Sequence, residues 1–278
     1  MGAPFLGSEA LAQGATWTEL QSRNRRVLRD VYVTADTQLT AALRAKAGWL
    51  WSGRQAVVAG RSAAALHGSK WVDPSAPVEL IHGHRHRLAG LQIHGDAVEP
   101  EDVCVVDGIP VTTPARTALD LACWNSTMTA VAAVDSLARA TQLKLAEVVP
   151  LVERSSGRRG IARARRTLAL VDPGAQSPKE SWLRVTLVEA GLPCPRTQIP
   201  VENEFGDVVA YLDMGWEDVM VAAEYDGEHH RTVRSQYSYD IRRLEMLQRR
   251  GWTVVRVTAE DKADNVVRRV RAALASRA

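Results

Sequence analysis

The chain has 278 residues, of which 46% are hydrophobic and 24% charged, and its formal net charge is +3. This length suits one large or two medium domains, and the composition is ordinary for a globular protein. No apolar run approaches membrane-spanning length, and the N-terminus lacks the basic start and long apolar core of a signal peptide. We therefore expect a cytoplasmic protein, and a net charge this small does not by itself indicate nucleic-acid binding.

The cysteines and the basic residues bear on whether the protein has disulfides, a zinc site or a nucleic-acid ligand. Cys104, Cys123 and Cys194 are odd in number and far apart in sequence, which excludes a disulfide framework and a CxxC zinc site. Only five of the 35 basic residues are lysines. Arginine suits phosphates and guanine edges, but a GC-rich genome explains the same bias equally well.

Residues 8–33 predict two short helices followed by a basic strand. Residues 8–13 form the first helix, and Thr16 with Glu19 makes a capping box for the second. A strand-like run over 27–33 follows. This is the order of a small winged helix-turn-helix, in which the second helix enters a groove and arginines of the wing hold phosphates. The DNA-binding candidates are Arg23, Arg25 and Arg26. The alternative is a helical hairpin with a solvated basic end.

Residues 37–112 predict two helices and then a β-rich section. The helices cover 37–47 and 60–68, with a short strand at 56–59 between them. The later strands are expected at 77–82, 91–94 and 103–106, with a hairpin turn at Asp107-Gly108. His82, His84 and His86 alternate and can share one face, which allows a zinc site; a basic surface strand or a loop is the alternative.

Residues 113–171 are predicted to be helical. Pro114 stands at a first helical position, and further helices are expected at 127–140, 145–153 and 157–170. The last carries arginines that form either a phosphate-facing stripe or a solvated face: Arg158, Arg159, Arg163, Arg165 and Arg166. Two prolines and a glycine make residues 171–178 the best linker. We therefore predict domains over 1–70, 71–171 and 177–278.

Residues 177–278 predict the order α-β-β-β-α-β-α, with a helix connecting the third strand to the fourth as a parallel crossover requires. Acids stand on or next to the strands, namely Asp213, Glu224 and Asp226, and Glu180 lies in the first helix. An unpaired carboxylate is costly to bury. These acids therefore indicate a metal or catalytic site, unless they lie on a hairpin that faces water.

This block resembles the PD-(D/E)XK, restriction-endonuclease-like superfamily, and it looks closest to nuclease-like domains related to very-short-patch repair endonucleases. The resemblance rests on Ser177-Pro-x-Glu180, Arg196-x-Gln198, Leu212-Asp213, Val221-Ala-Ala-Glu224-Tyr-Asp226-Gly227, His230, Tyr239-Asp-x-Arg-Arg243 and Gly251-x-x-Val254-Val-Arg256. It implies an α/β domain with a mixed central sheet flanked by helices.

A nuclease of this kind needs an activated water and charge neutralisation at the phosphate, both of which Mg²⁺ or Mn²⁺ supplies. The expected ligands are Asp213 and Glu224, with Glu180 as an additional ligand through water. His230 is the candidate general acid or base. The superfamily often has lysine where this chain has Asp226. The residues that remain to orient water or bind phosphate are Lys179, Gln198, His230, Arg243 and Arg256; Arg243 can equally pair with Asp226 as structure.

Residues 8–120 are similar to the winged-helix domain and following segment of abortive-infection (AbiE-type) antitoxins. The similar pieces are Trp17-Thr-Glu-Leu, Val31-Tyr-Val, Ser62-Ala-Ala-Ala-Leu-His67-Gly68 and Val111-Thr-Thr-Pro-Ala-Arg-Thr-Ala-Leu-Asp120. This resemblance implies an α+β winged-helix-containing domain, DNA binding and a nucleotidyltransferase toxin as partner.

Two hypotheses follow. The first is a metal-dependent DNA endonuclease with an N-terminal DNA-binding module. The alternative is a non-catalytic DNA-binding regulator or antitoxin that uses the nuclease fold as a scaffold.

Overall fold

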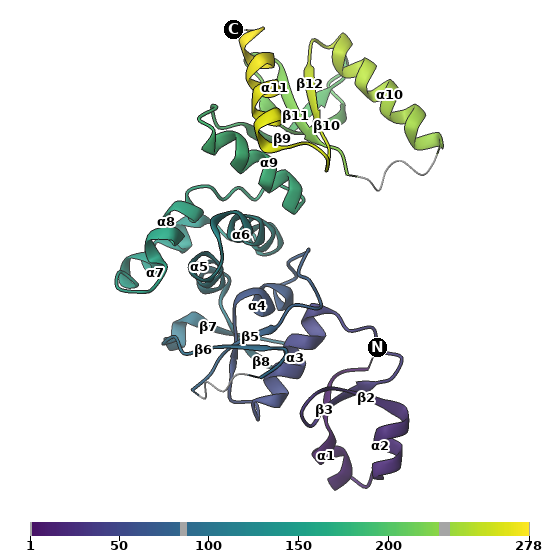
Figure 1. Cartoon of the computed structure of the whole chain (residues 1–278), viewed down its shortest axis with the longest axis vertical. Helices are drawn as coiled ribbons and strands as arrows, with labels where there is room; N and C mark the ends of the chain where they lie inside the picture. Colours follow the sequence, from purple (N-terminus) through teal and green to yellow (C-terminus); the bar gives the residue numbers. More distant parts are fainter. Residues whose placement is uncertain (1, 84–87, 228–233, 278) are drawn as a thin grey trace. The chain divides into compact units, whose positions relative to one another are not determined.

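The computed structural model describes residues 2–83, 88–227 and 234–277 (Figure 1). The chain divides into two compact units, Met1–Val171 and Asp172–Ala278. The division falls at the start of the linker predicted over 171–178. Both units are mixed α/β, and none of the described helices is long and apolar enough to cross a membrane.

The first unit begins with two helices and a three-stranded sheet of order β1-β3-β2. Its elements are β1 (Phe5–Leu6), α1 (Gly7–Ala12), α2 (Trp17–Arg23), β2 (Asn24–Leu28) and β3 (Val31–Thr34). The predicted capping box is confirmed, because Glu19 N donates to Thr16 Oγ1 at 3.2 Å and Thr16 N donates to Glu19 Oε2 at 3.0 Å.

The single strand predicted over 27–33 is wrong, because β2 and β3 form an antiparallel hairpin. The chain reverses at Asp30, whose φ is +61°. Its carboxylate accepts hydrogen bonds from Ser8 N at 2.9 Å and Ser8 Oγ at 2.5 Å, at the start of α1. Aspartate tolerates this left-handed conformation better than most residues, and the bonds to Ser8 hold the turn against α1.

A five-stranded sheet of order β6-β5-β4-β8-β7 follows. Its strands are β4 (Val57–Val58), β5 (Val78–Ile81), β6 (Leu91–His94), β7 (Val103–Val106) and β8 (Ile109–Thr112), with helices α3 (Ala41–Trp51) and α4 (Gly60–Leu66). The boundary predicted at residues 70 and 71 crosses this sheet, since β4 pairs with both β5 and β8.

Two local features explain how the helices meet this sheet. Helix α3 continues past its predicted end at residue 47. Gly48 lies inside it at a close approach to β5, where a Cβ would be 2.6 Å from Val78 Cγ1. The Asp107-Gly108 hairpin turn between β7 and β8 is confirmed, and both residues have positive φ.

The helical part of the first unit packs α5 against α4, α6, α7 and α8. The elements are η1 (Pro100–Asp102), α5 (Pro114–Trp124), α6 (Thr127–Thr141), η2 (Leu145–Glu147), α7 (Val149–Arg154) and α8 (Ile161–Leu168). Thr113 caps α5 and Pro114 stands at its first position, as predicted. The shared core includes Leu119, Leu121, Leu137 and Ala164.

The second unit has the predicted α-β-β-β-α-β-α order. Its elements are α9 (Pro178–Glu189), β9 (Arg196–Glu202), β10 (Val208–Trp216), β11 (Val221–Tyr225), α10 (Arg234–Arg249), β12 (Thr253–Val257) and α11 (Ala263–Ala275). The sheet order is β12-β11-β10-β9, and the expected parallel pairing of β11 with β12 across α10 is confirmed. One hydrophobic cluster joins α9 and α11 to the sheet, and a second holds Leu247 of α10 against it.

Candidate functional sites

The acids predicted in the second unit come together from α9, β10 and β11. Ser177 caps α9 and Pro178 stands at its first position, so that Glu180 lies in the first turn, where it is buried. Glu180 Oε2 accepts hydrogen bonds from Gln176 N at 2.8 Å and from Gln198 Nε2 at 3.5 Å. Gln198 is therefore a neighbour of the acids.

Asp213 lies where β10 and β11 stop pairing. Their antiparallel register runs from Trp216↔Val221 to Met214↔Ala223. Asp213 is the next residue of β10, and its Oδ2 accepts a hydrogen bond from Tyr225 N at 2.9 Å. Burial raises the pKa of Asp213 from 3.8 to about 7, and the negative charges of Glu180 and Glu224 act in the same direction. The three acids are thus close enough to repel one another.

The two acids at the end of β11, Glu224 and Asp226, each have an arginine partner. Glu224 Oε2 accepts from Arg243 Nη1 at 2.9 Å and Glu224 Oε1 from Arg243 Nη2 at 2.6 Å. Asp226 Oδ2 accepts from Arg256 Nη2 at 2.7 Å. Arg243 thus pairs with Glu224, whereas the sequence had offered Asp226 as its structural partner.

Two other residues, His230 and Lys179, were predicted to take part in the nuclease site. His230 lies outside the described residues, as do His84 and His86 of the histidine run. The Lys179 ammonium lies over the Tyr225 ring, 5.7 Å from its centroid, where a cation–π contact engages it.

The described donors do not fit Mg²⁺ or Mn²⁺ in this arrangement. Mg²⁺ takes carboxylate and water oxygens in near-octahedral geometry, and a guanidinium that holds both oxygens of a carboxylate competes with the ion for them. Both oxygens of Glu224 are held by Arg243, and one oxygen of Asp213 accepts a main-chain N–H. Among the residues that the structure describes, no group of three or more His, Cys, Asp and Glu side chains is placed to hold a metal ion.

The arginines predicted to contact DNA lie on the exposed end of α2 and on the β2–β3 hairpin. Arg23, Arg25 and Arg26 are all exposed. Arg25 is partly committed, because its Nη2 donates to Thr37 O at 2.9 Å. The sequence reasoning missed Arg29, which is also exposed, because it read one strand where the chain forms a hairpin.

The basic stripe predicted over 158–166 divides into partly buried and exposed members. Arg158 pairs with Asp96 at 2.9 Å and with Asp120 at 2.7 Å, and Arg163 donates to Cys123 O. The members left exposed are Arg159, Arg165 and Arg166.

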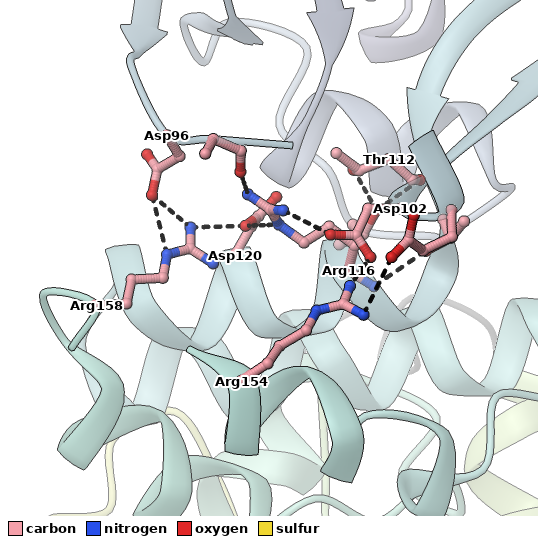
Figure 2. A network of polar contacts seen from close by, with 11 residues as sticks. Asp96, Asp102, Thr112, Arg116, Asp120, Arg154 and Arg158 are labelled. Atoms are coloured by element: carbon pink, nitrogen blue, oxygen red, sulfur yellow. Dashed lines mark hydrogen bonds and ion pairs between the residues drawn. The ribbon is translucent and has the colours of Figure 1, made fainter. Parts of the chain in front are cut away.

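Arg158 belongs to a network of buried charges that the sequence reasoning did not find (Figure 2). Arg116 pairs with Asp102 and Asp120, each at 2.9 Å, and Arg154 also contacts Asp102. A signal was present: Arg116 and Asp120 stand four residues apart within the apolar helix α5, where solvent-facing charges are not expected.

Comparison with known proteins covers most of the chain. Two proteins of Mycobacterium tuberculosis, the uncharacterized protein MT2308 of strain CDC 1551 and the uncharacterized protein Rv2248 of strain H37Rv, are each 32% identical over 256 residues. The alignments cover 91% of this chain and 90% of each relative. The chain belongs to the same family as these mycobacterial proteins. No solved structure matches it significantly.

In addition, residues 56–170 of the chain match the family model of the AbiEi antitoxin C-terminal domain. The matched segment runs from β4 to the end of α8 and contains the buried charge network. The AbiE-type resemblance predicted for residues 8–120 is confirmed over 56–120, where the match overlaps it. None of these comparisons supports the predicted relation of residues 177–278 to very-short-patch repair endonucleases.

Proposed function

We propose that the chain is the antitoxin of a toxin–antitoxin pair and that it binds DNA through its N-terminal helices and hairpin. The observation that carries this proposal is the match of residues 56–170 to the AbiEi antitoxin C-terminal domain. An antitoxin implies a toxin partner. The resemblance of residues 8–120 to abortive-infection antitoxins makes a nucleotidyltransferase the expected toxin.

The DNA-binding part of the proposal is supported by the charge and exposure of the first 36 residues. Helix α2 is capped at Thr16 and presents Trp17, which is 55% exposed, on its surface. The β2–β3 hairpin directly follows α2 and therefore stands where the wing of a winged helix-turn-helix stands. Arginines at such a position can neutralise phosphates while the preceding helix approaches a groove. The exposed set is Arg23, Arg25, Arg26 and Arg29.

In this proposal the second unit is a non-catalytic scaffold with a restriction-endonuclease-like fold. Its element order and the parallel β11–β12 crossover support the fold. The pairing of Glu224 with Arg243 and of Asp226 with Arg256 supports the absence of catalysis, because both of these acids are engaged by arginines of the same unit. The antitoxin alternative is therefore preferred to the endonuclease that the sequence placed first.

Salt-dependent DNA binding tests the assignment of the N-terminal arginines. We expect the association constant for a duplex from the chain's own promoter, measured by fluorescence anisotropy, to fall linearly with salt on logarithmic axes. Changing Arg23, Arg26 and Arg29 together to Gln should reduce the slope by about 2 to 3, at about 0.9 for each lost phosphate contact. Arg25 is left intact because it also holds Thr37.

The matched control removes the same charge from α8 and the turn before it. The triple variant Arg159→Gln, Arg165→Gln and Arg166→Gln should leave the slope unchanged, since these exposed side chains lie outside the proposed DNA-binding segment. DNA binding that does not depend on salt, or an equal loss in both variants, would refute the N-terminal assignment.

Co-expression tests the antitoxin assignment separately. We expect the chain to restore growth to cells that express the nucleotidyltransferase encoded next to it. If no such neighbour exists, or if growth is not restored by folded protein, the antitoxin proposal fails even where DNA binding is retained.

A further inference from the structure

The second unit gathers three acids whose charged forms repel one another. Glu180 lies in α9, Asp213 lies in β10 next to the last residue that pairs with β11, and Glu224 lies in β11. Glu180 and Glu224 are both 9% exposed. Because buried like charges repel, a cation or a cationic side chain beside such a cluster stabilises its charged form.

The structure supplies that partner from the chain itself. The Arg243 guanidinium makes a two-pronged contact with Glu224, at 2.9 Å and 2.6 Å, and its Nη2 also donates to Tyr211 O at 2.7 Å. A planar guanidinium matches a carboxylate in this bidentate manner, whereas a lysine ammonium cannot.

Packing of α10 holds Arg243 in this position. Leu247 lies four residues on and therefore on the same side of the helix. Its side chain is fully buried in a cluster with Ile199 and Leu212 of the sheet. Arg243 is thus fixed by the same packing that joins α10 to the sheet, and its contact with Glu224 is a built feature of the unit.

Asp226, two residues after Glu224, also has an arginine partner from the same unit. Asp226 is held by Arg256, which stands directly opposite Glu224 in the parallel β11–β12 register. Both acids at the end of β11 therefore have arginine partners from within the unit, and neither offers two free oxygens to a metal ion.

We propose that the guanidinium of Arg243 takes the place of a divalent cation in the cluster of Glu180, Asp213 and Glu224. The charge that a bound Mg²⁺ would supply is supplied by the side chain, and the unit folds and functions without metal. Removal of this guanidinium frees Glu224 beside Asp213 and creates a cation site. The inference is independent of the antitoxin proposal, since it concerns only residues of the second unit.

Mn²⁺ binding to the full chain, followed by electron paramagnetic resonance of the free ion, tests this inference. The wild type should bind no stoichiometric Mn²⁺ at up to about 1 mM. Arg243→Gln should bind one ion with a dissociation constant at least about tenfold below this concentration. Adding Glu224→Gln to that variant should abolish the gain.

The matched control is Arg249→Gln, which removes an exposed arginine of the same helix that pairs only loosely with Glu245 at 3.7 Å. It should behave as the wild type. Arg243→Lys keeps the charge without the fork and should bind Mn²⁺ less well than Arg243→Gln.

Two results would overturn the proposal. One is stoichiometric Mn²⁺ binding by the wild type that is lost in Asp213→Asn, and this measurement decides the matter even if every Arg243 variant fails to fold. The other is a folded Arg243→Gln protein, with wild-type circular dichroism, that gains no affinity.

Discussion

Replacing Asp213 with Asn should stabilise the second unit at neutral pH but not at acid pH. The folded-state pKa of Asp213 is about 7, raised from 3.8 first by burial and then by the charge of Glu180. Between these values the folded chain retains a proton that the unfolded chain releases. The carboxyl therefore costs nothing below about pH 4, an increasing amount up to about pH 7, and its full cost above.

The magnitude follows from the size of the shift. A rise from 3.8 to about 7 corresponds to at most about 4 kcal/mol, at about 1.4 kcal/mol for each tenfold change in proton affinity. Relaxation around a partly accessible group reduces this, and we expect about 2 kcal/mol. An Asn side chain keeps an oxygen for Tyr225 N, which donates to Asp213 at 2.9 Å, and it carries no charge.

Urea unfolding of the wild type and the variant between about pH 4 and pH 8 measures the effect. The difference in unfolding free energy should be near zero at the acid end and should grow in favour of Asp213→Asn towards pH 8. A difference that stays flat across this range, or a variant that is less stable at pH 8, would refute the reasoning.

Asp261 provides a control of opposite sign in the same unit. The hydrogen bond from Thr258 N, followed by those from Arg269 and Asn265, holds the pKa of Asp261 below its usual value. A depressed pKa stabilises the fold above the unfolded value and is lost as pH falls through the folded value. Asp261→Asn should therefore destabilise the unit at neutral pH, with the difference disappearing in acid.

Three further substitutions test the first unit by chemical unfolding. Gly60→Ala should cost about 2 to 4 kcal/mol, because φ is +53° and a Cβ would overlap the buried Glu79 carboxylate; Gly68→Ala, at φ +85° with no atom within 4 Å, should cost only about 1 kcal/mol. Equal costs would contradict the overlap. Asp102→Ala should cost about 3 to 5 kcal/mol by leaving Arg116 with one buried partner fewer, and a loss below about 1 kcal/mol would mean that water replaces that partner.

The sequence predicted best what depends on neighbouring residues. The capping box at Thr16, the proline-initiated α5 and the turn at Asp107 all follow from local chemistry, and each is confirmed. The order of elements in the second unit is confirmed for the same reason, because each strand and helix there carries its own start and stop signals.

The partners of charged residues depend on distant contacts and were predicted less well. Arg243 pairs with Glu224 because of where α10 packs on the sheet, and local sequence around either residue does not specify that placement. Strand β4 has only two residues, so its pairing with β5 and β8 was not visible and the boundary at residue 70 was misplaced.

The buried charge network of Figure 2 bears on how the antitoxin-like segment is turned over in a cell. Its charges come from the loop before η1, from η1, from α5, from α7 and from the turn before α8. Loss of the chain after Arg154 would therefore take away Arg158, which would leave Asp96 without this partner and Asp120 with Arg116 alone. A carboxylate stripped of its buried partner destabilises what remains. Truncation after Arg154 would therefore destabilise the part of the segment that remains as well as shorten it.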